Sequence, residues 1–448
     1  MIVMKFGGSS VESACAIERV AGIVAARLSR KPVVVVSAMG KTTNKLLAIA
    51  NDAVAGHRTK ALDMLCELRE FHLREAPAES EPFLAASFKE IEELVKGLSV
   101  LGELTPRSID AISSYGERLS SAVVTQMFLN LGIPAENVDS RSVIVTDNRH
   151  TQAAPLFPQT YERLAATVAK TAQDRVLVMG GFIGATESGV TTTLGRGGSD
   201  FSASIVGAGI GAEEIQIWTD VDGMLTSDPT VLPGGHRVKT ISFAEAAELA
   251  YFGAKVLHPS TVIPAIEKNI PVLILNSRRP EVEGTRIVKD LVHCGNVAKS
   301  IACKKNITLV NIISTRMLMA HGFLRRIFEV FDRYETAVDM VATSEVSVSL
   351  TIDNALRLEA IGKELCQFAE VTVETDQAIV CLVGDNIRYT PGVASRVFRA
   401  LDKINVRMIS QGASLLNLGV VVAQSDLRAA AEVLHDEFFH DLDPAVFD

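Results

Sequence analysis

Two glycine-rich segments of the sequence each carry a basic residue that could meet an anion. In KFGGSS, Lys5 precedes Gly7 and Gly8, whose missing side chains let backbone N–H groups approach a phosphate. In LGRGGSD, Arg196 lies among three glycines, and its guanidinium can bind a carboxylate through two hydrogen bonds. Asp200 closes this second segment and is a candidate helix N-cap or ligand contact. The two segments predict a site for a phosphate and a carboxylate.

Two further segments carry carboxylates. Glu117 follows Gly116 in a helical pattern, where it could hold an ammonium group or be a solvated surface charge. Asp220 and Asp222, in WTDVDG, come directly after an apolar run that is typical of a buried strand. Ligands bind at the carboxyl ends of parallel strands in α/β sheets, so a nucleotide contact is one interpretation of this pair. An ordinary Asp-Gly turn is the other.

The elements that must position these residues alternate between strand and helix patterns. MIVMKF and PVVVVSAM are almost continuous apolar runs, separated by apolar residues at helical spacing. Such runs are typical of parallel strands covered on both faces, so we predict an α/β domain with a mainly parallel sheet over residues 1–295. Residues 43–131 carry helical patterns almost without β-branched runs and predict a helical lobe attached to the sheet.

The region after residue 295 contains two repeats that resemble each other. GFLRRIFEVFDRY begins at Gly322 and GVASRVFRALDKI begins at Gly392, and strand patterns surround each of these helical segments. Each repeat therefore predicts a small α+β module of the βαββαβ type. The segment SIACKK, before Asn306, reads as a strand but has no predicted partner strand within the first repeat. We therefore predict a first module at 307–375, inserted into a second module made of 296–306 with 376–448.

Composition excludes several classes of protein. The 448 residues are 48% hydrophobic and carry a formal net charge of −9, which argues against disorder and against a basic nucleic-acid binder. The six cysteines form no CxxC pair, and no zinc-binding pattern occurs, so we expect no metal site of the protein's own. No signal peptide or membrane-length apolar run is found, and we expect a cytoplasmic location without a membrane partner.

In this order, KFGGSS, SYGER, TTLGRGGSD, TDVDG and FGAKVLHP resemble the motifs of aspartate kinases, members of the amino-acid-kinase family. The resemblance covers essentially the whole chain, and the two C-terminal modules resemble ACT domains. It implies an αβα-sandwich kinase domain that transfers a phosphoryl group from ATP, with Mg²⁺, to the side chain of L-aspartate. The product would be L-4-aspartyl phosphate, the first intermediate on the route to lysine, threonine and methionine.

The resemblance also implies which residues form the site. Lys5 and Asp200 would be catalytic. Aspartate would be surrounded by Ser37, Thr43, Glu117, Arg196, Ser199 and Asp200. ATP would be contacted by Lys5, Gly7, Gly8, Thr219, Asp220, Leu225, Thr230 and Lys255. Leu225 and Thr230 stand where a tyrosine and an arginine are common in the family, so we expect the nucleotide to rest more on the other residues of this set.

A further implication is feedback inhibition. HGFLRRIF and VDMVATSEVSVSLT resemble the lysine-sensitive branch of the family, so lysine is the expected effector. Its site would be lined by Met317, Ala320, Gly322, Phe323, Leu324, Val338, Asp339, Ser344 and Glu345. Ala320 stands where a hydroxyl residue can occur. The ACT modules would join two chains in a homodimer, or more chains in a tetramer.

The chemistry of the expected reaction fits these residue types. The carboxylate of aspartate is already ionised at pH 7 and needs neutralisation of charge rather than a general base. Three alternatives stay open: another kinase of this fold, a catalytically inactive amino-acid sensor, and a regulated dehydrogenase. The presence of Lys5, Arg196 and Asp200 argues against an inactive sensor, and the lack of a usable dinucleotide fingerprint argues against a dehydrogenase.

Overall fold

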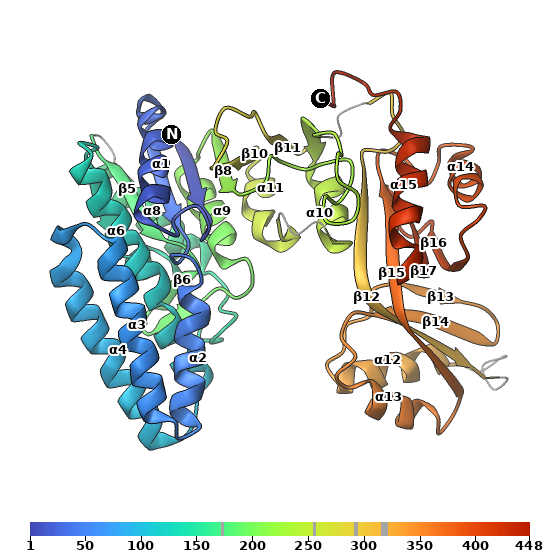
Figure 1. The fold of residues 1–448 in the computed structure, drawn as a ribbon, viewed down its shortest axis with the longest axis horizontal. Helices are drawn as coiled ribbons and strands as arrows, with labels where there is room; N and C mark the ends of the chain where they lie inside the picture. Colours follow the sequence, from blue (N-terminus) through green and yellow to red (C-terminus); the bar gives the residue numbers. More distant parts are fainter. Residues whose placement is uncertain (172–173, 254–256, 291–293, 315–320) are drawn as a thin grey trace. The chain divides into compact units, whose positions relative to one another are not determined.

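The chain folds into two units in a computed structural model that describes residues 1–171, 174–253, 257–290, 294–314 and 321–448 (Figure 1). The first unit comprises Met1–Gly223 with Val256–Asp290, and the second comprises Met224–Lys255 with Leu291–Asp448. Each unit has its own sheet and covering helices. The domain boundaries inferred from the sequence, at residues 295, 306 and 376, remain predictions.

A mainly parallel sheet forms the centre of the first unit. Across the sheet, the strands are β3 (Ala135–Val138), β5 (Val176–Gly180), β2 (Pro32–Val36), β1 (Ile2–Phe6), β8 (Glu214–Thr219), β10 (Val272–Asn276) and β11 (Thr285–Val288). Neighbouring strands pair in parallel except β11, which is antiparallel to β10. Every residue of β1, β2 and β5 is buried, because helices cover both faces, and this explains their nearly continuous apolar sequences. The predicted fold class is confirmed.

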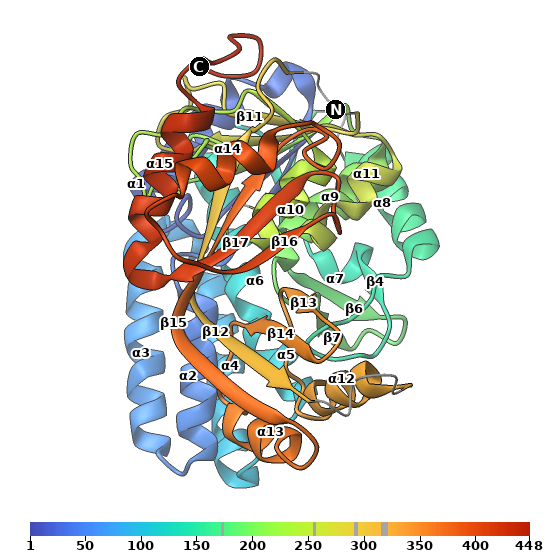
Figure 2. The same ribbon diagram turned by 90° about the vertical axis from the view of Figure 1, so that its right-hand side faces the viewer.

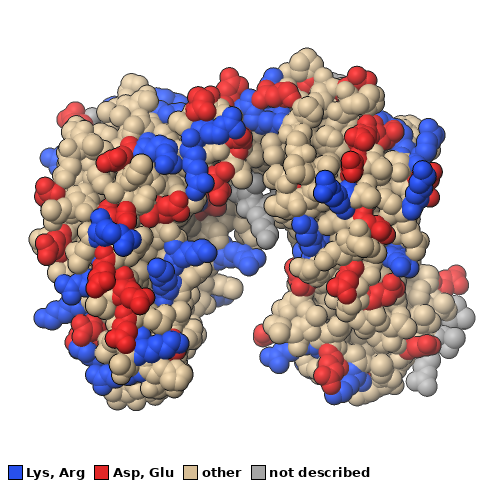
Figure 3. All heavy atoms as spheres, viewed as in Figure 1, with Lys and Arg blue, Asp and Glu red and all other residues tan. Residues whose placement is uncertain are grey.

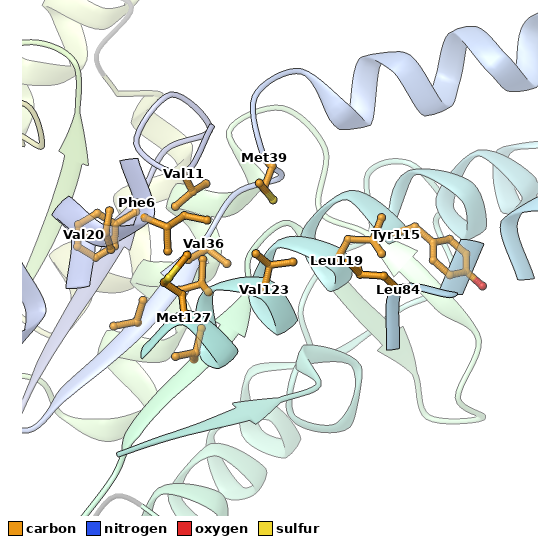
Figure 4. Packing of buried hydrophobic residues seen from close by; sticks show 14 of the residues in the cluster. Phe6, Val11, Val20, Val36, Met39, Leu84, Tyr115, Leu119, Val123 and Met127 are labelled. Carbon is orange, nitrogen blue, oxygen red and sulfur yellow. The ribbon is translucent and has the colours of Figure 1, made fainter. Parts of the chain in front are cut away.

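The alternation of side chains along β1 decides where Lys5 points. The covering helices are α1 (Ala14–Ala25), α6 (Tyr115–Asn130), α8 (Phe157–Thr171), α9 (Gly198–Ile210) and α11 (Ile263–Glu267). Phe6 packs in one apolar cluster with residues of α1 and α6 (Figure 4). Val3 faces the other way, since a Cβ on Gly207 of α9 would lie 3.8 Å from it. Lys5 follows Val3 at the period of two of a strand, so it reaches the face covered by α9.

A lobe of helices projects from this unit, as the sequence predicts for residues 43–131. Its helices are α2 (Thr42–Val54), α3 (Arg58–Glu75), α4 (Glu81–Leu101) and α5 (Pro106–Ser113), followed by α6. Leu84, Phe88 and Ile91 of α4 recur at helical spacing and are buried in the same apolar cluster as α6. Gly102 ends α4 with φ +68°, a conformation that favours glycine.

A small second sheet lies beside the site. Its strands are β4 (Val145–Thr146), β6 (Ile183–Thr186) and β7 (Thr191–Thr193). The sequence SVIVTD predicts a longer strand before β4, and this prediction is wrong over its first residues, which belong to the short helix α7 (Ser140–Val143). The helix forms there because the Asp139 side chain accepts a hydrogen bond from Arg141 N and caps its first turn.

An antiparallel sheet forms the centre of the second unit. Across it, the strands are β13 (Val341–Thr343), β14 (Ser347–Ile352), β12 (Ser300–Ile313), β15 (Glu370–Val383), β17 (Asn417–Ala423) and β16 (Val406–Gln411). Its helices are α12 (Phe323–Arg333), α13 (Leu358–Leu365), α14 (Val393–Ala400) and α15 (Leu427–Phe438). The expected α+β class of this region is confirmed.

Two long strands connect the halves of this sheet (Figure 2). Residues 300–304 of β12 pair with 379–383 of β15, and residues 307–313 pair with 370–377. The register shifts after Lys304, where Asn306 has φ +58° and its N–H donates to Gln424 Oε1 at 2.6 Å. Strand segment 300–304 thus pairs with the part of β15 that also pairs with β17, and the insertion of one predicted module into the other stays a prediction.

Residues 224–255 also belong to the second unit. They form β9 (Thr240–Ser242) and α10 (Phe243–Tyr251), whose first turn is closed by a capping box between Ser242 and Glu245. Glu245 Oε1 lies 2.8 Å from Lys299 Nζ, and both side chains are fully buried. This buried ion pair connects α10 to the residue that precedes β12.

The charged surface, the apolar character of the helices and the grouping of possible metal ligands bear on what the chain could bind. On the face in Figure 3, acidic and basic side chains are interspersed over both units. Within the described ranges, no helix is both long and apolar enough to cross a membrane, and no three His, Cys, Asp or Glu side chains are grouped as metal ligands.

Candidate active site

A cavity of about 290 Å³ gathers most of the predicted aspartate-binding residues. It is lined by Lys5, Ser37, Thr43, Glu117, Phe182, Gly195, Gly197, Gly198, Ser199 and Asp200. These residues come from the carboxyl ends of β1 and β2, from Phe182 between β5 and β6, and from the helices α2, α6 and α9 with the loops before them. The carboxyl edge of a parallel sheet is where α/β folds bind ligands. The cavity is therefore the candidate active site.

A larger hollow, of about 870 Å³, lies along α4 and α5 in the helical lobe. Its lining is mostly apolar and contains none of the predicted site residues. The larger hollow also carries charged side chains, Lys89 and Arg107 among them, but it lies away from the carboxyl edge of the parallel sheet, so the smaller cavity is the better candidate for chemistry.

Lys5 and Asp200 form an ion pair at the base of the site. Lys5 Nζ lies 2.7 Å from Asp200 Oδ1, and Lys5 is only 8% exposed. Asp200 is not the N-cap of α9, which is Gly197, but it lies in the first turn of this helix, where the helix dipole and free backbone N–H groups produce positive potential. The pair holds a cation in place on a rigid central strand, close to a helix N-terminus that favours anions.

Glu117 is buried on α6 beside this pair. Its Oε1 accepts a hydrogen bond from Ala38 N at 3.2 Å, and its Oε2 is buried without a hydrogen-bond donor in the described part of the chain. Burial raises the pKa of Glu117 to about 8. Gly116 is needed before it because a Cβ there would lie 2.5 Å from Thr43 Oγ1. This carboxyl group has one oxygen available for a cationic ligand.

The raised pKa of Glu117 predicts how aspartate binding depends on pH. Below about pH 8 the free site carries a neutral Glu117, and an ammonium ligand must drive off its proton to form an ion pair. The KM for aspartate should therefore fall as pH rises from 6 to 8, by at most about tenfold per unit. Steady-state rates at several pH values measure this.

The matched variants are Glu117→Gln, which should raise the KM and flatten its dependence on pH, and Glu187→Gln, an exposed control. A KM that stays constant with pH in the unmodified protein, or the same slope in Glu117→Gln, would contradict the ammonium-binding role.

The glycines around Arg196 have separate structural reasons. Gly195 and Gly197 have φ +77° and +69°, which glycine adopts without strain. A Cβ on Gly198 would lie 2.6 Å from the ring of Phe182. Arg196 itself is exposed, is not part of the cavity lining, and has no ion-pair or hydrogen-bond partner among the described residues. Its guanidinium is thus available to a ligand.

Phe182 is the residue of the cavity that sequence reasoning missed. It has φ +67°, and its N–H donates to Ser202 Oγ of α9 at 2.9 Å. A non-glycine residue with positive φ is uncommon and often marks a site, but nothing in the letters GGFIG reveals the dihedral angle.

The predicted phosphate-binding glycines lie in a tight turn after β1. Gly7 N donates to Trp218 O at 3.0 Å, and a Cβ on Gly8 would lie 2.9 Å from Ala38 O and Gly40 O. Gly8 is therefore required by backbone packing as well as by any phosphate.

Thr219 and Asp220 are the predicted nucleotide residues at the end of β8. Thr219 Oγ1 donates to Asp220 Oδ1 at 3.2 Å, and Asp220 is exposed. The neighbouring Asp222 instead accepts hydrogen bonds from Asn276 Nδ2 and Arg279, which makes it a structural turn residue. Of the two carboxylates, Asp220 is the one available for a ligand.

The remaining nucleotide candidates belong to the second unit. The Leu225 carbonyl accepts a hydrogen bond from Ser300 Oγ at 2.6 Å. Thr230 donates to Asp228 Oδ1 through both its N–H and its hydroxyl, each at 2.8 Å. Lys255 lies outside the described residues. Their role in nucleotide binding stays a prediction.

The predicted effector site contains an ion pair that the sequence did not reveal. Asp339 Oδ1 lies 2.6 Å from Lys304 Nζ, which also contacts Asp353 Oδ2 at 2.9 Å. Asp339 Oδ2 is buried and has no hydrogen-bond partner within the described ranges, and burial raises the pKa of Asp339. A cationic group is thus already bound at the carboxylate expected to hold the effector's ammonium.

The other predicted effector residues surround the start of α12 and the β13–β14 turn. Gly322, with φ +79°, precedes the buried Phe323, whereas Leu324 and Glu345 are exposed. Ser344 Oγ closes the turn between β13 and β14 through a hydrogen bond to Ser347 Oγ. The remaining predicted positions are Val338, which is partly buried, and Met317 and Ala320, which lie outside the described residues.

Comparison with known proteins identifies relatives of this site. The model of the amino acid kinase family matches residues 1–276, and an ACT domain model matches residues 380–438. Chloroplastic aspartokinase 1 of Arabidopsis thaliana is 38% identical over 460 residues, which cover 98% of this chain and 80% of the relative. Lysine-sensitive aspartokinase 3 of Escherichia coli K12 is 35% identical over 452 residues, covering 98% and 99%.

Solved structures of one bacterial enzyme are similar along nearly the whole chain. E. coli aspartokinase III in complex with aspartate and ADP superposes with a TM-score of 0.84 at 33% identity, covering 98% of this chain and 100% of that one. The same enzyme in complex with lysine and aspartate superposes with a TM-score of 0.85 at 33% identity and the same coverage.

Proposed function

The chain belongs to the aspartokinases of the amino acid kinase family, and on this premise we propose which residues carry the reaction and its regulation. The reaction is the transfer of the γ-phosphoryl group of ATP to the side-chain carboxylate of L-aspartate. The observation that carries the assignment of residues is the cavity in which the Lys5–Asp200 pair and Glu117 meet.

Aspartate is held by three charged groups in this proposal. Its α-ammonium pairs with Glu117, whose Oε2 is buried without a donor in the described part of the chain. Arg196 takes the α-carboxylate, for which a guanidinium offers two parallel hydrogen bonds. The side-chain carboxylate then points to Lys5 and the N-terminus of α9. A relative whose structure contains aspartate and ADP supports this choice of ligands.

Phosphoryl transfer requires neutralisation of charge, because an anionic carboxylate approaches an anionic triphosphate. The Lys5 ammonium and the N-terminal N–H groups of α9 stabilise the negative charge on the transferring group. Asp200 keeps Lys5 oriented through their 2.7 Å ion pair. No residue has to remove a proton, since the attacking carboxylate is ionised at pH 7.

Mg²⁺ enters with ATP in this proposal. The described residues contain no group of three side chains that would hold a metal ion by themselves. Mg²⁺ keeps several waters and is often bound by phosphates with one or two carboxylates. Asp200 and Asp220 are the carboxylates near the site that could contribute.

A substrate panel tests the assignment. Release of ADP, followed with a coupled assay, should require aspartate and should be much slower with glutamate, acetylglutamate or a nucleoside monophosphate. Equal rates with one of these acceptors would show a different kinase of this fold. No release of ADP with any acceptor would show an inactive sensor.

Lysine is the proposed effector. A relative is named lysine-sensitive, and a solved neighbour contains lysine with aspartate. An ammonium group of the effector would take the place of Lys304 Nζ at Asp339 or would bind the buried Oδ2 of the same carboxylate. The ring of Tyr251 on α10 lies 5.7 Å from Lys304 Nζ. Displacement of Lys304 would therefore change a contact made by α10.

Lysine titrations of variants test this effector site. Asp339→Ala and Glu345→Ala should each lose most of the inhibition by lysine, since a charge-assisted hydrogen bond contributes about 1.5–3 kcal/mol, or roughly 10- to 100-fold in affinity. Lys304→Met should respond to less lysine, because a tethered competitor is gone. The measurement is residual activity at fixed aspartate, with threonine titrated in parallel.

Glu359→Gln, a change of an exposed carboxylate on α13, is the control and should respond as the unmodified protein does. Insensitivity of the unmodified protein to lysine, or an unchanged response of both alanine variants, would exclude this site.

A homodimer through the second unit is the proposed assembly. The edge strands of its sheet expose apolar side chains, with Val341 on β13 and Ile409 on β16 being 38% and 46% exposed. Unpaired edges with apolar side chains favour association with another chain. Sedimentation equilibrium distinguishes a monomer of 48.1 kDa from a dimer or tetramer.

A further inference from the structure

Asp110 is a fully buried carboxylate that the reaction described above does not use. It lies on α5, and its side chain is completely inaccessible to solvent. Its oxygens accept hydrogen bonds from His150 Nδ1 at 2.7 Å, from Thr193 Oγ1 at 2.5 Å, and from Thr151 N at 3.0 Å to each oxygen. A carboxylate with this many donors fixes the segments that supply them.

The Thr151 backbone is held in an unusual conformation by this contact. Its φ is +72°, which branched L-residues rarely adopt. Such a conformation persists only where its surroundings determine it. Its carbonyl oxygen lies against Gly195, where an added Cβ would be 3.2 Å away. Asp110 therefore fixes a piece of backbone that packs directly on Gly195.

Thr193 connects the same carboxylate to the other side of Gly195. It is the last residue of β7, two positions before Gly195 in the chain. The Thr193 carbonyl accepts a hydrogen bond from Ala153 N at 2.9 Å. Ala153 is two residues after Thr151 in the chain. Asp110 thus holds both the strand that leads into residues 195–198, here called the glycine segment, and the backbone that packs against it.

The glycine segment needs such an anchor. Gly195, Gly197 and Gly198 line the active-site cavity and carry Arg196 between them. Arg196 has no partner of its own among the described residues, so its direction must come from the backbone on either side. Glycine-rich backbone loses much conformational entropy on ordering, and an external anchor lowers that cost when the ligand binds.

We propose that Asp110 is a positioning residue for aspartate binding: through Thr151 and Thr193 it holds the glycine segment so that Arg196 meets the substrate carboxylate. This inference rests on the proposed role of Arg196. Asp110 itself touches neither substrate nor nucleotide. The hydroxyl of Thr193 is the part of the anchor that can be removed with the least change of shape.

The test compares two buried threonines in the holoenzyme. Thr193→Val removes the hydrogen bond to Asp110, and Thr160→Val removes an equally buried hydroxyl that bonds Val145 instead. Thr193→Val should raise the KM for aspartate about tenfold, as expected for one lost hydrogen bond to a charged group, with kcat and the KM for ATP nearly unchanged. Thr160→Val should leave all three constants unchanged.

A double-mutant cycle separates positioning from general structure. In an Arg196→Ala background, Thr193→Val should change the KM for aspartate less than about twofold, because the group being positioned is absent. Asp110→Asn, which keeps the size of the side chain, should behave as Thr193→Val does. Thermal melting confirms that each variant is folded.

Two results would overturn the inference: an unchanged aspartate KM in Thr193→Val, or the same fold-change with and without Arg196. Normal kinetics of Arg196→Ala would overturn a different statement, namely the proposed role of Arg196 as the carboxylate-binding residue.

Discussion

Replacing Lys5 with alanine is expected to lower kcat by about 100- to 1000-fold, the range found when one preorganised donor to a developing charge is removed. The KM for aspartate should change much less. The Lys5 charge matters most while the phosphoryl group is in transfer, so the lost interaction belongs to the transition state rather than to bound aspartate. Initial rates of ADP release, at varied aspartate and saturating ATP, give the two constants separately.

The Lys5–Asp200 ion pair sets the controls for this experiment. Lys5→Ala leaves Asp200 without its 2.7 Å partner, and part of any loss could come from that carboxylate. The double variant Lys5→Ala with Asp200→Asn removes both charges and should be no more active than Lys5→Ala alone. Lys268→Ala, at the end of α11, is an exposed control. A rise in KM with kcat intact would refute the role in phosphoryl transfer.

The sequence predicts the charged centre of the site because each charge is next to a recognisable local pattern. Lys5 interrupts an apolar strand, Glu117 follows a helical glycine, and Asp200 comes just after a glycine-rich segment at the start of a helical pattern. Parallel strands end on one edge of a sheet, so the order of elements is enough to bring these segments together. The same reasoning explains why the α/β class and the helical lobe could be predicted.

The anchor of the glycine segment could not be predicted in this way. Asp110 and Thr193 are 83 positions apart, and neither α5 nor β7 carries a pattern that indicates their contact. Thr151 is a β-branched residue, which sequence rules place in a strand rather than at positive φ. These hydrogen bonds depend on how the helical lobe packs on the small sheet of β4, β6 and β7. The spacing of residues within one segment does not predict that packing.

The pairing of Lys304 with Asp339 was missed for a related reason. Lys304 lies in SIACKK, whose pattern indicates only a strand, and the sequence does not show which of its side chains faces Asp339. The register of β12 changes after Lys304, so the alternation of side chains cannot be extrapolated from one half of the strand to the other. Only the structure shows that Asp339, the carboxylate predicted to bind the effector, is already paired with Lys304.

Arg196→Ala is expected to lower kcat/KM for aspartate by about 100-fold or more, because a bidentate pair with a carboxylate is among the strongest hydrogen-bonded contacts. Arg196 is exposed and without a partner in the described part of the chain, so binding aspartate breaks no existing ion pair of this residue. Arg196→Lys keeps the charge but loses the planar fork, and should recover little of the loss.

The deciding comparison uses kcat/KM, measured at aspartate concentrations well below the KM. Under these conditions the rate reports the free energy of the transition state relative to free enzyme and free substrate. Arg175→Ala removes another exposed arginine, which pairs with Glu136 away from the cavity, and should be without effect. Saturating aspartate should restore part of the rate in Arg196→Ala, since Lys5 and α9 still act on the phosphoryl group. Near-normal kcat/KM in Arg196→Ala, or full recovery in Arg196→Lys, would exclude bidentate recognition of the substrate carboxylate by this residue.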